Sequence, residues 1–145
     1  MTTLINSSTK DENEFRAVRL KKLETLRERG IDPYPSGFQK THTLSQIQHT
    51  YASLEAGQET TDNVRIAGRI ASIRNSGMFI DLWDPYEKLQ VFCHKNHLSE
   101  EQLELIKLLD LGDFIGVEGI VRRTPRGEIT VNSEEITLLS KSLLP

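Results

Sequence analysis

The chain lacks the features that would support a disulfide framework, a membrane span or a secretory leader. Its 145 residues include a single cysteine, Cys93, which excludes an internal disulfide and any paired-cysteine metal site. No apolar run is long enough to cross a bilayer. Residues 1–8 lack the basic start and apolar core of a signal peptide. These absences predict a cytoplasmic protein without a membrane segment.

A strong positive charge is missing as well. The formal net charge is −3, whereas a module that only grips phosphates is usually basic. The negative net charge therefore argues against strong non-specific nucleic-acid binding. It remains compatible with a small site that reads a few bases, or with a domain whose affinity is completed by another part of a larger protein.

Catalytic and metal-binding signatures are also absent from the sequence. It contains no phosphate-binding glycine loop, no G-x-S-x-G and no dinucleotide fingerprint. None of the histidines has a cysteine or carboxylate at metal-ligand spacing on a shared element; they are His42, His49, His94 and His97. We expect His94 and His97 to be loop residues, and Cys93 to be inert packing. Asp81 and Asp84 flank Trp83 and are expected to support a turn.

The first 60 residues divide into a tail and a helical appendage. Residues 1–11 are polar and are expected to be disordered, and a capping-box spacing of Asp11 and Glu14 predicts a helix over 12–29. A second short helix is expected near 44–54, within an appendage spanning 12–60. The basic side chains of the first helix either form a solvated face or lie along a nucleic-acid backbone; candidates for the latter are Arg16, Arg19 and Lys22.

Residues 61–145 have the pattern of a mainly β domain. Alternating apolar residues predict strands near 64–70, 78–83, 88–93 and 114–121, and a fifth from about 128 with a break near Ser133. Ser99 and Gln102 form a capping box that opens a helix between the third and fourth strands. This order is that of the OB-fold, a five-stranded barrel whose second and third strands commonly bind oligonucleotides.

The predicted strands leave two aromatic rings on one outer face. Ile80, Leu82, Leu89 and Val91 occupy the core side, so Phe79, Gln90 and Phe92 point outward. Exposed rings can stack unpaired bases, while Gln90 and Arg74 could read base edges. Strict alternation places Arg74 on the core side, so this reading requires a bulge or a strand end before it. The alternative is that helices or a partner domain cover this face.

The same residues carry a family resemblance. The matching stretches are Leu26–Pro35, Val64–Leu82, Leu109–Gly119 and Gly127–Pro145, within about residues 12–145. With these motifs the chain resembles the N-terminal anticodon-binding domain of class II lysyl-tRNA synthetases. The OB-fold signature by itself is shared with the aspartyl and asparaginyl enzymes.

The resemblance implies that the sheet grips the anticodon loop of tRNA(Lys), UUU or CUU. By motif position, Phe79, Gln90 and Arg74 read the central uridine, Phe92 stacks beside it, and Glu135 lies near another anticodon base. The Arg74–Phe79 loop is shorter than in many lysyl enzymes, and the class II motifs for ATP, magnesium and lysine are absent.

We therefore expect a domain of a larger lysine–tRNA ligase, with no cofactor, metal site or catalytic site of its own. Its parent would be a homodimer that uses ATP and magnesium for aminoacylation. The rival interpretations are a general single-strand-binding OB module and a protein-docking OB domain. An aspartyl or asparaginyl identity is a further alternative, which the first and third anticodon bases would distinguish.

Overall fold

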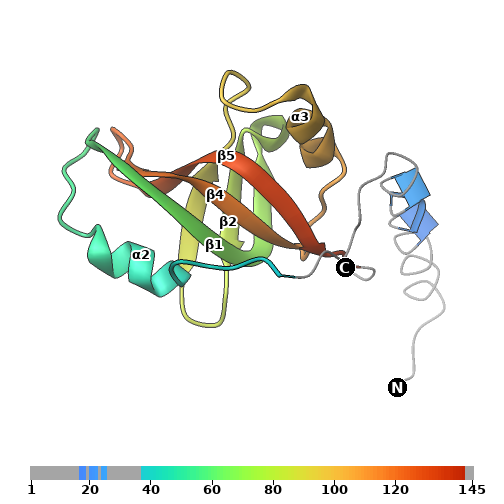
Figure 1. The fold of residues 1–145 in the computed structure, drawn as a ribbon, viewed down its shortest axis with the longest axis horizontal. Helices are drawn as coiled ribbons and strands as arrows, with labels where there is room; N and C mark the ends of the chain where they lie inside the picture. Colours follow the sequence, from blue (N-terminus) through green and yellow to red (C-terminus); the bar gives the residue numbers. More distant parts are fainter. Residues whose placement is uncertain (1–16, 19, 23, 26–36, 143–145) are drawn as a thin grey trace.

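Five strands close into a barrel in the order β1-β2-β3-β5-β4 (Figure 1). The structure is a computed structural model that describes residues 17–18, 20–22, 24–25 and 37–142. The strands are β1 (Glu59–Arg74), β2 (Phe79–Trp83), β3 (Lys88–Phe92), β4 (Phe114–Arg123) and β5 (Ile129–Ser140). Helix α3 (Glu100–Lys107) lies between β3 and β4 along the chain. The predicted OB-fold order is confirmed.

Helix α2 (Leu44–Thr50) packs against the barrel by its apolar side. Leu44 and Ile47 are fully buried in the same core as the inward residues of the strands. A capping box fixes its start, because Thr43 and Gln46 each accept the other's backbone N–H. The expected second helix is therefore present, although it ends before residue 54.

A β-bulge in β1 changes which side chains face outward. Ile70 pairs with Leu82 and Ser72 pairs with Asp81, so Ala71 is an extra residue in β1. Before this point the even-numbered residues of β1 face the core; after it, Ile73 packs against the core and Arg74 is exposed. The bulge that the sequence required before Arg74 is thus present at Ala71.

A second bulge interrupts the pairing of β4 with β5. Glu118 pairs with Glu135, and Gly119 pairs with Ser133, which leaves Glu134 as the extra residue. Gly119 permits this close approach, because a Cβ there would collide with the carbonyl oxygen of Asn132. The predicted break near Ser133 is confirmed.

Helix α3 shows one departure from its predicted cap. The Ser99 hydroxyl accepts the Gln102 backbone N–H at 3.1 Å, as a capping box requires. The Gln102 side chain instead bonds Ile136, donating to its carbonyl at 3.1 Å and accepting its N–H at 2.6 Å. The capping box is therefore only half formed, and the amide ties α3 to β5.

The predictions for the N-terminal segment fall mostly outside the described residues. Residues 17–18, 20–22 and 24–25 are helical, which confirms that part of the predicted helix over 12–29. The expected disorder of 1–11, the Asp11–Glu14 capping box, Arg16 and Arg19 lie outside the described residues. Among the helices in the described ranges, none is both long and apolar enough to span a bilayer.

Candidate nucleic-acid interface

Two phenylalanine rings form the centre of an outward-facing row across the sheet. Arg74 on β1 lies opposite Phe79 on β2, Phe79 lies opposite Phe92 on β3, and Phe92 lies opposite Asn132 on β5. The ring centroids of Phe79 and Phe92 are 5.0 Å apart, and the Arg74 guanidinium carbon is 5.3 Å from the Phe79 centroid. Both rings are partly exposed, so neither α2 nor α3 buries them. The structure therefore brings the predicted aromatic residues together.

A second row of polar side chains runs beside the rings and is linked by hydrogen bonds. Arg74 Nη2 donates to Asp81 Oδ1 at 3.0 Å and to Gln90 Oε1 at 2.9 Å. Gln90 Nε2 donates to Thr130 Oγ1 at 3.0 Å, and the Ser72 hydroxyl donates to Asp81 Oδ2. Each side chain in this hydrogen-bonded row is thus oriented by its neighbour on the next strand.

This geometry suits the reading of a base edge more than the gripping of a phosphate. The Arg74 side chain is 48% exposed, and it retains N–H donors beyond the Nη2 contacts. The Asp81 carboxylate offsets the positive charge of Arg74. The remaining N–H donors of Arg74 therefore contribute mainly through directional hydrogen bonds, and less through net charge. A polar groove of about 360 Å³ adjoins these groups and is lined by Arg74, Asp81, Lys88, Leu89, Gln90 and Glu128.

The predicted role of Asp81 in a turn is wrong. The turn after β2 is supported by Asp84 Oδ1, which accepts the backbone N–H groups of Tyr86 and Glu87, both at 2.8 Å. Asp81 instead faces Ser72 and Arg74 in the polar row. The signal was available, because Asp81 has the same parity in β2 as Phe79 and must share its face.

The far end of the aromatic row holds residues that the sequence had not singled out as a site. The rings of Phe92 and His94 are 5.5 Å apart, and His94 meets His97 edge-on at 5.7 Å. The Arg122 guanidinium carbon is 5.5 Å from the Phe92 centroid. His94 and His97 follow β3 in a loop, as predicted. Arg122 and Asn132 were missed because they reach this face only through the pairing of β5 with β3 and β4.

Glu135 lies on β5 beyond the second bulge and is exposed. It pairs with Glu118 on β4, whereas β3 ends at Phe92, opposite Asn132. Within the described residues, no hydrogen bond or ion pair joins Glu135 to Arg74 or Gln90. Its assignment to an anticodon base remains a prediction.

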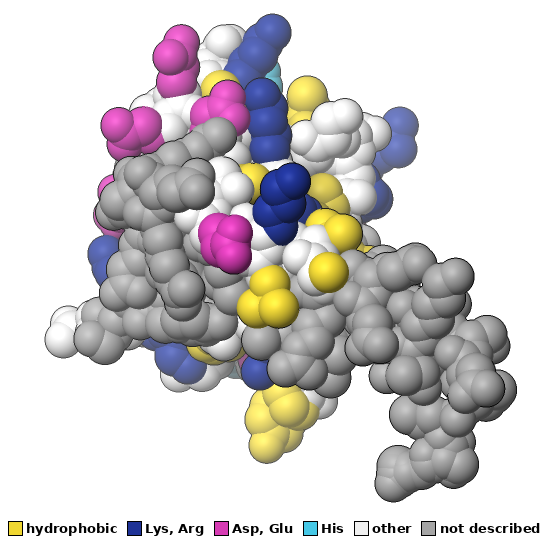
Figure 2. Space-filling view, turned by 90° about the vertical axis from the view of Figure 1, so that its right-hand side faces the viewer, with side chains coloured by type: hydrophobic (Ala, Val, Ile, Leu, Met, Phe, Trp, Pro, Cys, Tyr) yellow, Lys and Arg dark blue, Asp and Glu magenta, His cyan; other side chains and the backbone are white. Residues whose placement is uncertain are grey.

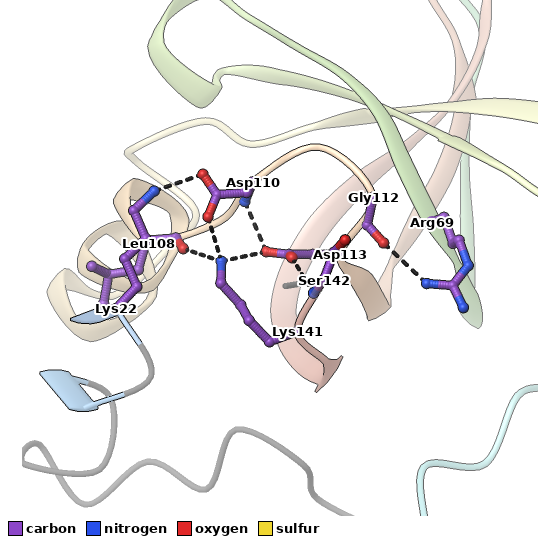
Figure 3. Close-up of polar contacts among 8 residues, drawn as sticks. All are labelled: Lys22, Arg69, Leu108, Asp110, Gly112, Asp113, Lys141 and Ser142. Atoms are coloured by element: carbon purple, nitrogen blue, oxygen red, sulfur yellow. Dashed lines mark hydrogen bonds and ion pairs between the residues drawn. The ribbon is translucent and has the colours of Figure 1, made fainter. Parts of the chain in front are cut away.

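Lys22 belongs to a charged cluster at the barrel end, shown in Figure 3. Its Nζ lies 2.7 Å from Asp110 Oδ1. The fully buried Lys141 ammonium contacts Asp110 Oδ2 at 2.8 Å, Asp113 Oδ2 at 2.6 Å and the Leu108 carbonyl at 2.7 Å. The predicted contact of Lys22 with a tRNA backbone stays a prediction, and in this structure its charge is matched by a carboxylate.

The cluster perturbs the titration of one member. Burial by itself would raise the pKa of the Asp110 carboxyl, but hydrogen bonds and ion pairs to Lys141 and Lys22 hold that pKa below its usual value. The cluster joins the loop before β4 to the end of β5 and to the described N-terminal helical residues (Figure 3).

Cys93 is buried and packs in the core, as predicted. Burial raises the pKa of its thiol to about 11, against the opposing effect of a hydrogen bond with Ser133. A thiol with such a pKa is a poor nucleophile at neutral pH. In the described ranges, no group of three or more histidine, cysteine or carboxylate side chains is placed to hold a metal ion.

The molecular surface does not offer one continuous basic area on the side viewed in Figure 2. Lys and Arg side chains there are accompanied by acidic and exposed hydrophobic ones. Residues with exposed apolar side chains include Trp83, Tyr86 and Leu111. On this side, positive charges are therefore interspersed with acidic and apolar groups and do not form a single basic patch.

Comparisons with known proteins relate this barrel to a family. Residues 64–139, just over half of the chain, match the family model described as an OB-fold nucleic acid binding domain. A lysine–tRNA ligase of Agrobacterium fabrum is 47% identical over 145 residues, which are 100% of this chain and 29% of that protein.

Similar values hold for relatives in other organisms. A lysine–tRNA ligase of Rhizobium meliloti is 52% identical over 128 residues, covering 88% of this chain and 26% of the relative. One from Dehalococcoides mccartyi is 46% identical over 137 residues, covering 92% and 28%. The chain therefore spans less than a third of the length of these curated relatives.

Proposed function

Because the chain belongs to the family of OB-fold nucleic acid binding domains, we propose that its Phe79 face binds a tRNA anticodon loop and reads the central base. The observation that carries this proposal is that the aromatic row and the polar row lie side by side on the sheet and share Arg74. Phe79 and Phe92 provide a platform, while Arg74 and Gln90 are held beside it at 2.9 Å from each other.

The two rows supply different parts of recognition. Stacking of a base on an aromatic ring contributes about 1–3 kcal/mol and tolerates any base. Hydrogen bonds from Gln90 and Arg74 select among bases, because only a matching edge satisfies their donors and acceptors. Uracil carries a carbonyl oxygen at C4, where cytosine carries an amino group, so the donors of Arg74 favour uracil over cytosine.

The relatives' names supply the choice of tRNA. Since they are lysine–tRNA ligases, we propose that the RNA is tRNA(Lys), with anticodon UUU or CUU, and that this chain acts as the anticodon-binding part of such a ligase. ATP- and magnesium-dependent aminoacylation, dimerisation and a cytoplasmic location are proposed for the whole enzyme. On this proposal residues 61–145 form the anticodon-binding domain and 12–60 its helical appendage.

A titration of two anticodon stem-loops tests the base-reading role. One carries UUU and the other has the central uridine replaced by cytidine. We expect the chain to prefer the uridine, and Gln90→Ala to reduce that preference by about 5-fold or more, since a good base-edge contact contributes about 1–3 kcal/mol of discrimination.

Gln39→Ala is the matched control, because Gln39 is an exposed glutamine outside both rows. Equal binding of both stem-loops, with steep salt dependence, would instead indicate a general single-strand-binding module. No binding to either stem-loop would contradict the RNA proposal and favour a protein-docking face.

A further inference from the structure

A shallow hollow of about 440 Å³ lies beyond the polar row, on the outer side of β1 and β2. Its lining includes Arg69, Ala71, Trp83, Lys88 and Leu111. Trp83 has the same parity in β2 as Phe79, so its indole ring faces outward, and the residue is 43% exposed. Leu111, in the loop before β4, is also exposed. A hollow of this volume falls in the range of small-ligand sites, about 300–1,000 Å³.

Two cations flank the indole ring in the register of the sheet. Arg69 on β1 and Lys88 on β3 each pair with Trp83 on β2. Arg69 Nη1 donates to the Gly112 carbonyl at 3.0 Å, and its guanidinium carries further donors (Figure 3). Within the described residues, neither cation takes part in an ion pair. An aromatic surface between two such cations is complementary to a group that joins a planar ring to a negative charge, as a nucleotide does.

The hollow continues the face to which we assign the reading of the central base. Lys88 also lines the polar groove beside Arg74 and Gln90, so this lysine joins the two depressions. Trp83 lies at the other end of β2 from Phe79, about 13 Å away along the strand. Neighbouring stacked nucleotides are about 3.4 Å apart along a strand, so at least one nucleotide separates a base on Trp83 from a base on Phe79. If Phe79 holds the central base, the base on Trp83 lies outside the triplet.

We propose that the Trp83 hollow binds a nucleotide of the tRNA loop that adjoins the anticodon triplet and is not part of it. Trp83 stacks the base, while Lys88 and Arg69 contact the phosphate beside it. Because an aromatic ring tolerates every base, this site adds affinity and fixes the position of the strand without selecting a sequence. The inference rests on the proposed function and extends it beyond the three bases that are read.

Intrinsic fluorescence tests this contact directly, because Trp83 is the single tryptophan of the chain. We expect a UUU anticodon stem-loop to quench this fluorescence at saturation. Two further stem-loops carry an abasic nucleotide next to the triplet, one on its 5′ side and one on its 3′ side. One of the two should fail to quench and should bind about 5-fold or more weakly, since the stacked base is lost. Replacement of the central uridine by cytidine should leave the quenching at saturation intact.

Variants of the ring separate this contact from the reading of the central base. Trp83→Ala should weaken binding of the UUU stem-loop by about 5-fold or more and leave the preference for central uridine over cytidine unchanged. The abasic nucleotide should then have no further effect, because both changes remove the same contact. Trp83→Phe keeps a ring and should retain most of the affinity. Tyr86→Ala is the matched control, because Tyr86 is 85% exposed in the turn after β2 and does not line the hollow.

A salt series tests the contact with phosphate. Lys88→Gln should reduce the salt slope of stem-loop binding by about one unit. Lys40→Gln changes an exposed lysine before α2 and should leave the slope as it is. An unchanged slope in Lys88→Gln would overturn the phosphate contact.

The outcomes distinguish this inference from the proposed function. Full affinity of Trp83→Ala, or quenching that survives both abasic substitutions, would overturn the nucleotide site while a preference for central uridine in the wild-type chain upheld the base-reading role. The hollow would then be a surface for a protein partner. Loss of the central preference in Trp83→Ala would show that the ring only supports the polar row. Absence of stem-loop binding by the wild-type chain would overturn both proposals.

Discussion

At the scale of single residues, Asp81 fixes the position of the Arg74 guanidinium. Its carboxylate lies 3.0 Å from the guanidinium and holds it beside Gln90. We expect Asp81→Ala to free Arg74 for phosphate contacts, which lowers central-base discrimination and makes the salt slope of binding steeper by about one unit. Stem-loop titrations across a salt series measure both effects.

Glu55→Ala removes the same charge from an exposed loop residue and serves as control. If it reproduced the steeper slope, the effect would come from net charge and not from the release of Arg74. Retained discrimination in Asp81→Ala would show that Gln90 keeps its orientation through Thr130 alone.

The residues of the central site differ in how far the sequence could place them. Phe79, Gln90 and Phe92 follow from alternation within single strands, which is local information. Arg74 required a bulge whose position at Ala71 depends on the β1–β2 register. Asn132 and Arg122, which lie beside Phe92, depend on the pairing of β5 with β3 and with β4, and these long-range pairs have no local signature.

At the scale of elements, the bulge at Ala71 determines which side chains at the end of β1 face the core and which face outward. Deletion of Ala71 would remove the extra residue, so that Ser72, Ile73 and Arg74 continue the alternation from Ile70, with Ile73 inward and Arg74 outward. We therefore expect the deletion variant to fold, with a loss of about 0.5–3 kcal/mol in urea unfolding. Stem-loop discrimination should be retained.

Ala71→Gly keeps the residue count and is the comparison for this deletion. It should cost about 1 kcal/mol or less and retain binding. A deletion variant that lost stem-loop discrimination would show that Arg74 needs the bulge itself, and not only its position opposite Phe79.

Elements near the barrel end were predicted in type but not in their connections. Helix α3 was expected from Ser99 and Gln102, yet the Gln102 side chain bonds Ile136 of β5. A capping motif specifies only the local backbone, whereas tertiary neighbours compete for the same amide. The periodicity of apolar residues likewise could not predict the Lys141 cluster, because this cluster joins residues about 30 positions apart.

At the scale of the whole molecule, the barrel-end cluster links stability to pH. The folded pKa of Asp110 is lower than its ordinary value of 3.8. Its stabilising contribution is therefore complete above that ordinary value and is lost as pH falls through the folded pKa. We expect Asp110→Asn to be less stable than wild type at pH 7, with the difference narrowing below about pH 4.

Urea unfolding at a series of pH values measures this difference. Glu55→Gln, at an exposed position, should follow the wild-type pH dependence. A constant gap between Asp110→Asn and wild type at every pH would show that packing, and not ionisation, carries the contribution of Asp110.

The pairing of β3 with β5 has a consequence for the order of events in folding. Gln90 and Thr130 are 40 residues apart in the chain, and their hydrogen bond crosses the seam at which the barrel closes. Contacts between distant segments require the closure of a long loop. The phenylalanine platform needs only the β2–β3 hairpin, whereas the bond from the Gln90 amide to Thr130 needs the closed barrel. We therefore expect full selectivity only from a chain whose barrel has closed.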